Sequence, residues 1–227
     1  MIFEAMIRDR RDEILEYLER KQFARVIDFG GAMSPWAAQY VTHYVDLQHP
    51  ETFHPGVVKN AEVILADLDD YKTWLQLCEY KPFDFAICTQ VIEHMLNPSL
   101  ALRILPRVAR EGFIGVPNKY VELYKKAHIS KKSDLDGHGL SGHFRGWLPH
   151  RWVITIRDGV VWFWPKLGFV EHLRMGWADS GELKVSEELC FRWRDEIPYK
   201  MITDMELDHP TPYEAIDLYL SELYKGI

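Results

Sequence analysis

The sequence has few cysteines and no long apolar run, and both absences narrow the class of protein. Its three cysteines, Cys78, Cys88 and Cys190, are far apart and form no Cys-x-x-Cys pair. This argues against a disulfide framework and a zinc site, and it favours a reducing compartment. No stretch reaches the roughly 18 uninterrupted apolar residues of a membrane span, and the first residues are too charged for a secretory signal. The sequence therefore predicts a soluble cytoplasmic protein.

An excess of positive charge is also missing. The chain of 227 residues carries 27 Lys and Arg against 34 Asp and Glu, a net charge of -7, so no chain-wide basic field attracts nucleic acid or an anionic membrane. The 47% of hydrophobic residues is typical of a globular chain. No repeat or low-complexity linker divides it. We expect a single domain over 1–227, with an N-terminal helix (1–21), a core (22–118), an insertion (119–166) and final strands with a C-terminal helix (167–227).

The most informative stretch is 25–37, RVIDFGGAMSPWA. Residues 26–29 predict a short buried strand that ends next to an acid, Asp28. Gly30 and Gly31 predict a tight turn that brings the backbone close to a ligand. The Ser-Pro pair that follows is typical of a helix start, and we expect a short helix at 36–40. A strand, glycine turn and helix of this kind place a nucleotide-like ligand at the edge of a parallel sheet.

Further strands and helices alternate after this turn. Asp46 ends the second strand, 18 positions after Asp28. An acid placed about 20 residues past such a turn binds ribose hydroxyls. Alternating strands and helices predict a doubly wound α/β sheet with polar residues at the carboxyl ends of its strands. The expected strands are 43–46, 61–66, 83–88 and 112–116, the expected helices are 71–80 and 98–110, and a loop is expected at 49–60.

The two ends of the chain follow other patterns. An apolar stripe over 3–21 predicts an amphipathic helix. The runs on both sides of Asp158-Gly159, within RWVITIRDGVVWFWPK (151–166), predict a β-hairpin with a type I′ turn. The remaining expectations are a helical turn within 120–126, strands at 169–175 and 189–194, irregular chain over 198–212 and a closing helix at 213–225.

The order of these signals resembles the class I S-adenosylmethionine-dependent methyltransferases, in their small-molecule, type-11-like group. VIDFGGA is similar to their first motif, YVD to the second, ILADLDD to the third and FDFAICTQVIEHMLNP to the fourth, and GFIGVPN to the segment that follows. The match covers about 22–118. It implies a doubly wound, mostly parallel seven-stranded Rossmann-like sheet, with the last two expected strands as its sixth and seventh, and S-adenosyl-L-methionine as the cofactor.

By position, the resemblance implies a cofactor site along the carboxyl ends of the first four strands. Its residues, from the amino-acid end through ribose and adenine to the methionine side, are Asp28, Gly30, Gly31, Asp46, Leu47, Asp67, Leu68, Thr89 and Gln90. The chain departs from the family at Ala32 and Ser34, where glycines are usual. Ubiquinone-type O-methyltransferases carry Glu-x-x-Glu-His, which is tied to a divalent cation. Gln90 replaces the first Glu here, so we expect no metal.

Two places offer a base for the acceptor. A hydroxyl acceptor needs one, and histidine titrates in the useful range. Glu93-His94 follows the fourth strand directly, and the stretch 128–150 contains His138, His143 and His150. These three histidines could line the acceptor site or bind a metal, and we favour an acceptor-side role for His143. The alternatives are that Glu93 bonds the helix start while His94 packs, and that the loop histidines are surface residues.

The acceptor and two rival functions stay open at this point. The acidic charge, and the lack of an Asn-Pro-Pro-aromatic motif after the fourth strand, favour a small acceptor methylated on oxygen or nitrogen, such as a sugar or another hydroxylated metabolite. A nicotinamide-dependent oxidoreductase would use the same sheet. A non-catalytic protein would bind a partner through the tryptophan-rich C-terminal half. The oligomeric state is open, a homodimer included.

Overall fold

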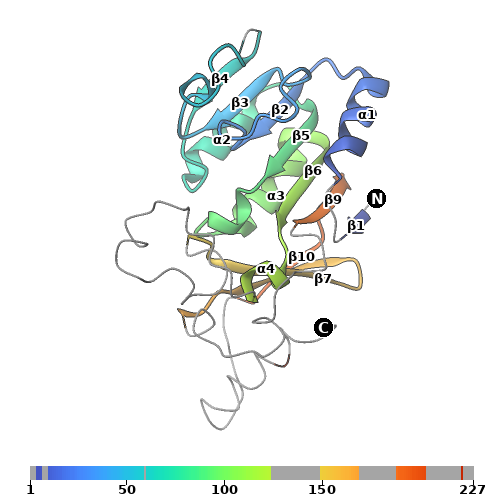
Figure 1. Ribbon diagram of the computed structural model, residues 1–227, viewed down its shortest axis with the longest axis vertical. Helices are drawn as coiled ribbons and strands as arrows, with labels where there is room; N and C mark the ends of the chain where they lie inside the picture. Colours follow the sequence, from blue (N-terminus) through green and yellow to red (C-terminus); the bar gives the residue numbers. More distant parts are fainter. Residues whose placement is uncertain are drawn as a thin grey trace.

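A seven-stranded sheet lies at the centre of the computed structural model, which describes residues 4–6, 10–58, 60–123, 149–168, 188–202 and 221. Its strand order is β1-β9-β6-β5-β2-β3-β4 (Figure 1). Neighbours from β6 to β4 run parallel, and β9 is antiparallel to both β6 and β1. The strands are β1 (Glu4–Met6), β2 (Val26–Phe29), β3 (His43–Asp46), β4 (Glu62–Leu65), β5 (Phe83–Thr89), β6 (Ala109–Pro117) and β9 (Glu188–Arg194). The predicted doubly wound, mostly parallel sheet is confirmed.

Helices cover both faces of this sheet because its central strands are apolar on both sides. On β5, Phe85 and Ile87 pack in one cluster with residues of α1 (Arg11–Lys21). Ala86 and Cys88 pack in the other, with residues of α2 (Tyr71–Glu79) and α3 (Pro98–Val108). Short helices η1 (Pro50–Thr52), η2 (Ile92–His94) and α4 (Lys119–Leu123) lie in the connections. None of the helices that the structure describes is long and apolar enough to cross a bilayer.

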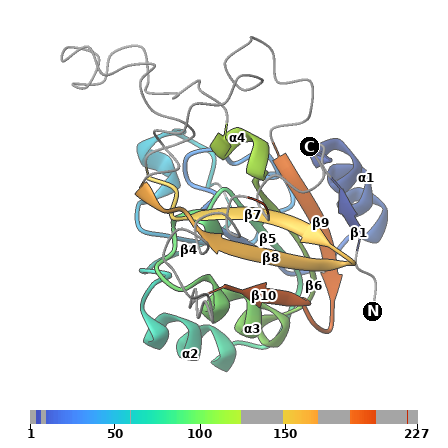
Figure 2. The same cartoon turned by 90° about the horizontal axis from the view of Figure 1, so that it is seen from below.

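A second, three-stranded sheet joins the face that carries α2 and α3. Its hairpin consists of β7 (Trp152–Arg157) and β8 (Val160–Pro165), and β10 (Tyr199–Met201) pairs parallel with β8. Figure 2 shows the hairpin running across the large sheet, with α3 on one side and α4 on the other. Asp158 and Gly159 have φ of 50° and 73°, the left-handed values of a type I′ turn. The predicted hairpin is confirmed.

Three sequence-based expectations are wrong. The stretch 3–21 is not one helix, because 4–6 forms the edge strand β1 along β9 and the helix begins at Arg11. Residues 36–40 form turns with bonds three residues apart, such as Tyr40 N to Ala37 O, and the Trp36 side chain donates to Thr89. Part of the segment 198–212 is ordered, since β10 completes the small sheet. The strand expected at 169–175 and, apart from Ser221, the closing helix at 213–225 lie outside the described residues.

Candidate functional site

A cavity of about 620 Å³ opens at the carboxyl ends of β2, β3, β4 and β5. This is the edge at which doubly wound sheets bind ligands, and the volume suits a small molecule or cofactor. Seven of the nine residues expected to bind a cofactor line it, namely Gly30, Asp46, Leu47, Asp67, Leu68, Thr89 and Gln90. Asp28 and Gly31 lie directly behind this lining, in contact with each other.

The glycine turn after β2 has no room for side chains. Gly30 has a φ of +72°, which favours glycine, and a Cβ there would collide with the side chain of Val91. Its N–H donates to the carbonyl of Val45 at 2.9 Å, which ties the turn to β3. A Cβ at Gly31 would collide with the carboxylate of Asp28. Any side chain at either position would collide with a neighbour, so both positions require glycine.

Asp28 is fully buried, and neither of its carboxylate oxygens has a hydrogen-bond partner among the described residues. Burial raises the pKa of this carboxyl well above its ordinary value of 3.8, the charge of Asp46 raises it further, and the charge of Arg11 lowers it. An unpaired buried acid costs free energy in the folded chain. This carboxylate is therefore poised to gain from a ligand that brings a positive charge or a hydrogen-bond donor.

Asp46, at the end of β3, is a carboxylate held in place by the backbone. One oxygen accepts a bond from the N–H of Ala32 at 3.0 Å, and the other accepts one from the N–H of Gln48 at 3.1 Å. Each carboxylate oxygen has capacity for a second bond. Asp46 therefore presents two acceptors to the cavity in a fixed geometry.

Arg11 also lines the cavity, although the sequence pattern assigned its whole region to a structural helix. It lies in the first turn of α1, and its Nη2 is 3.0 Å from the Oε1 of Glu188 on β9. The same oxygen accepts a bond from the side chain of Gln90 at 3.0 Å. Gln90 itself has a φ of 58°, a strained value for a residue with a side chain. No local pattern links Arg11 to Gln90 and Glu188, because the link exists only once the sheet has formed.

Beside this cavity lies a second polar group, which we call the histidine cluster: Glu93, His94, Glu122, His150 and Lys166. The Glu93 side chain is 1% exposed, and its oxygens have no hydrogen-bond partner among the described residues. Burial raises its pKa to about 8, the charges of Glu122 and Glu188 add to the rise, and the backbone near Val91 and Glu93 opposes it. His94 lines the cavity; its Nε2 is 3.8 Å from Glu93, and its ring lies edge-on to His150 at 4.7 Å between centroids.

The cluster is held together by a buried carboxylate and by the start of the hairpin. Glu122 on α4 accepts a bond from Nδ1 of His150 at 2.5 Å, and its other oxygen is 2.9 Å from Nζ of Lys166. The backbone N–H of Arg151 donates to the carbonyl of Glu93 at 2.8 Å. This bond fixes His150 against His94. The structure thus brings together Glu93, His94 and His150, all three of which the sequence offered as candidates, and adds Glu122 and Lys166, which it did not single out.

Glu93, His94 and His150 each offer one ligand atom, and these atoms lie within 4.8 Å of one another. A carboxylate and two imidazoles are a chemically suitable donor set for a metal ion. His143, the third residue expected in catalysis, lies outside the described residues.

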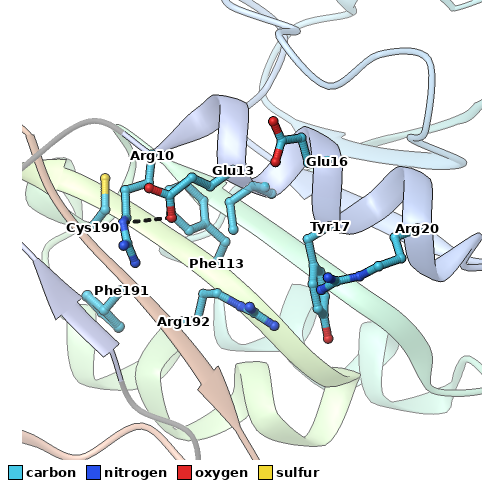
Figure 3. A pocket seen from close by; sticks show the side chains of 10 residues that line it. Arg10, Glu13, Glu16, Tyr17, Arg20, Phe113, Cys190, Phe191 and Arg192 are labelled. Atoms are coloured by element: carbon cyan, nitrogen blue, oxygen red, sulfur yellow. Dashed lines mark ion pairs between the residues drawn. The ribbon is translucent and has the colours of Figure 1, made fainter.

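A smaller cavity of about 230 Å³ lies between α1 and the strands β6 and β9 (Figure 3). Arg192 stacks on the ring of Tyr17 at 3.8 Å, and Arg20 lies 5.5 Å from the same ring. The hydroxyl of Tyr17 donates to Glu111 at 2.8 Å. None of the residues expected in a site lines this cavity, and its side chains bind α1 to the sheet.

No family model matches this chain, and no curated protein matches its sequence. Among solved structures, the N-terminal domain of EvdMO1 with SAH bound is 16% identical, with a TM-score of 0.37, over 56% of this chain and 55% of that one. The methyltransferase domain of bacterial CtHen1 is 11% identical, with a TM-score of 0.43, over 82% of this chain and 97% of that one. An S-adenosylmethionine-dependent methyltransferase from Clostridium acetobutylicum is 10% identical, with a TM-score of 0.44, over 82% and 90%.

The chain thus spans about half the length of the EvdMO1 domain and most of the other two. Two of these neighbours are named as methyltransferases, and the EvdMO1 domain was solved with SAH bound. The doubly wound sheet itself is established by the strand order described above.

Proposed function

We propose that the protein is an S-adenosylmethionine-dependent methyltransferase that methylates oxygen or nitrogen of a small-molecule acceptor. The observation that carries this proposal is the pair of acids on adjacent strands, Asp28 and Asp46, on either side of a turn that has no room for side chains. One acid is buried without a partner, and the other presents spare acceptors to a cavity of about 620 Å³.

The residues present fit this cofactor. Its ammonium group would supply the positive donor that Asp28 lacks. Arg11 lines the cavity, and its charge acts on Asp28, so Arg11 would pair with the carboxylate of the same ligand. Two ribose hydroxyls would use the spare acceptors of Asp46. Asp67 and the buried Leu68 follow β4 and line the same cavity, where they would receive the adenine edge.

Methyl transfer forms an O–CH₃ or N–CH₃ bond and breaks the S–CH₃ bond of the sulfonium, while a proton leaves the acceptor. Because the displacement is in line, the chain contributes mainly by holding the acceptor in position. His94 faces the cavity with the buried Glu93 behind it, at the end where Thr89 and Gln90 lie. We assign the acceptor side to this end and to Glu93-His94 the handling of the acceptor proton. The net charge of -7 favours a small acceptor over nucleic acid.

Calorimetric titration of the purified chain with S-adenosylhomocysteine, run beside NADH, tests the proposal. We expect micromolar binding of S-adenosylhomocysteine and none of NADH. Binding of NADH alone would replace the proposal with an oxidoreductase. Binding of neither compound would favour the alternative of a non-catalytic protein that has this sheet and binds a partner.

A further inference from the structure

We propose that Glu93, His94 and His150 bind a divalent transition-metal ion at the edge of the cavity. The three ligand atoms lie within 4.8 Å of one another. A shift of these side chains by about 1 Å would bring all three within bonding distance of one ion, at roughly 2.0–2.2 Å each. The sequence argued against a metal because Gln90 stands where an acid is usual. In the structure Gln90 turns its amide to Glu188, and the third donor comes from His150, at the start of the hairpin.

Glu93 is the strongest reason for an ion here. Its side chain is 1% exposed, and both carboxylate oxygens are buried without a hydrogen-bond partner among the described residues. Buried acids are normally paired with a donor, a positive charge or a metal, because leaving them unpaired is costly. The nearest described group to Glu93 that can carry a positive charge is His94, at 3.8 Å, which is beyond hydrogen-bond distance. An ion between the carboxylate and the two imidazoles would supply the missing partner.

The imidazole of His150 is oriented as metal ligands usually are. Glu122 accepts a hydrogen bond from the N–H at Nδ1 of His150, which favours the tautomer whose lone pair lies on Nε2. A histidine that ligates a metal typically donates its other N–H to a carboxylate or a backbone carbonyl in this way. Lys166, 2.9 Å from Glu122, balances the charge of the orienting carboxylate.

The donor set points to the class of ion. Mg²⁺ and Ca²⁺ prefer oxygen ligands, whereas two imidazoles and one carboxylate suit Mn²⁺, Fe²⁺, Co²⁺ or Zn²⁺. Three protein ligands leave coordination positions open, as in catalytic sites. His94 is 42% exposed and lines the cavity, so the open side faces the acceptor end.

The role of the ion rests on the proposed function, whereas its binding does not. An acceptor oxygen in an open position would lose its proton more readily. The lone pair of His94 would then be used in coordination, so coordination would replace His94 as the means of activating the acceptor.

The test is titration of the full chain, treated with EDTA and dialysed, with MnCl₂ alone, followed by the EPR signal of free Mn²⁺. We expect one Mn²⁺ per chain, and at least a tenfold loss of affinity in Glu93→Gln, which keeps the shape of the side chain. The matched control is Glu62→Gln, since Glu62 also lies near a histidine, 3.5 Å from His43, but outside the cluster. This control should bind Mn²⁺ like the unchanged protein.

A second variant guards against a folding defect in the first. His94→Gln changes a side chain that is 42% exposed, so it should stay folded and still lose Mn²⁺ affinity. No Mn²⁺ binding, or equal binding by Glu93→Gln and Glu62→Gln, would overturn the metal site. Titration of the same samples with S-adenosylhomocysteine separates the two proposals. Mn²⁺ binding without binding of S-adenosylhomocysteine leaves the metal site standing and removes the methyltransferase.

Discussion

Two polar groups meet at the carboxyl edge of the large sheet, and they are built in opposite ways. The first is the turn group, Asp28, Gly30, Gly31 and Asp46, which comes from two adjacent strands and is held by backbone bonds and by the absence of side chains. The histidine cluster comes from η2, α4 and the residues that flank the two ends of the hairpin, His150 and Lys166. It is held by side chains that pair with one another out of water.

The difference decides how each group responds to change. A backbone-built site keeps its frame when one side chain is shortened, so it loses binding while the protein stays folded. A cluster of buried charges behaves as a unit, because removing one member leaves another charged group without its partner. Substitutions in the cluster should therefore affect stability most, and those in the turn group should affect ligand affinity most.

The largest effect is expected for Glu122→Gln. This change removes the negative charge that faces Lys166, and the side chains of both residues are 1% exposed. Losing one member of a buried pair typically costs about 3–5 kcal/mol of unfolding free energy. Urea denaturation of the variant and of the unchanged protein measures this cost.

The double variant Glu122→Gln with Lys166→Met is the control, since it removes both charges. It should recover most of the lost stability. A double variant as unstable as the single one would show that the charge pair does not hold the cluster. The claim that the histidine cluster is held by paired side chains, unlike the turn group, would then be wrong.

The next prediction concerns the stability cost of adding a side chain at two glycines that have nearly the same φ. Gly30 and Gly159 have φ of +72° and +73°, but only Gly30 has a side chain, that of Val91, where a Cβ would lie. Gly159→Ala should cost about 1–2 kcal/mol for the left-handed φ alone. Gly30→Ala adds overpacking of about 1–3 kcal/mol. Urea denaturation of both variants gives the difference.

Adding Val91→Ala to Gly30→Ala sharpens this test. Removing the methyl groups of Val91 should bring the cost back toward that of Gly159→Ala, because only the strain of the backbone remains. Equal costs for Gly30→Ala and Gly159→Ala would mean that the turn yields freely, and that close packing does not set its shape.

A third change acts on binding. Asp46→Ala should weaken the binding of S-adenosylhomocysteine by about 1–3 kcal/mol, through lost hydrogen bonds to a charged group. The fold should persist, because backbone bonds from β3 to β2 and β4 remain. Calorimetry measures the affinity, and Glu62→Gln on the neighbouring strand serves as the control. Full affinity in Asp46→Ala would remove Asp46 from the cofactor site.

The same contrast explains how much the sequence could predict. The strands, most of the helices and the turn group follow from local patterns, since Asp28 and Asp46 lie close together in the chain and end two adjacent strands. The exceptions are also local patterns, overridden by tertiary pairing. Residues 4–6 form a strand because the edge of β9 offers bonds to them. Residues 36–40 form turns, and the Trp36 side chain of this segment donates to Thr89 on β5.

The histidine cluster could be predicted only in part. Glu93-His94 follows β5 in a recognisable place, so the sequence marks it. Glu122, His150 and Lys166 come from separate elements, and no spacing in the chain signals that they meet. Arg11 and Glu188 meet across almost the whole chain in the same way.

The smallest effect separates folding from binding at one residue of the turn group. Burial raises the pKa of Asp28, so its contribution to stability is complete below its ordinary value of 3.8 and falls as the pH rises through the folded value. Asn does not ionise. Asp28→Asn should therefore gain stability relative to the unchanged protein as the pH rises above about 4, and each 1 kcal/mol gained raises the melting temperature by about 2–4 °C.

The same variant should bind S-adenosylhomocysteine more weakly, because it has no charge to offer the ammonium group. Thermal unfolding at pH 4 and pH 8, with calorimetry at pH 8, checks both expectations. A variant that is less stable at pH 8 and binds equally well would show that Asp28 holds the turn and takes no part in binding.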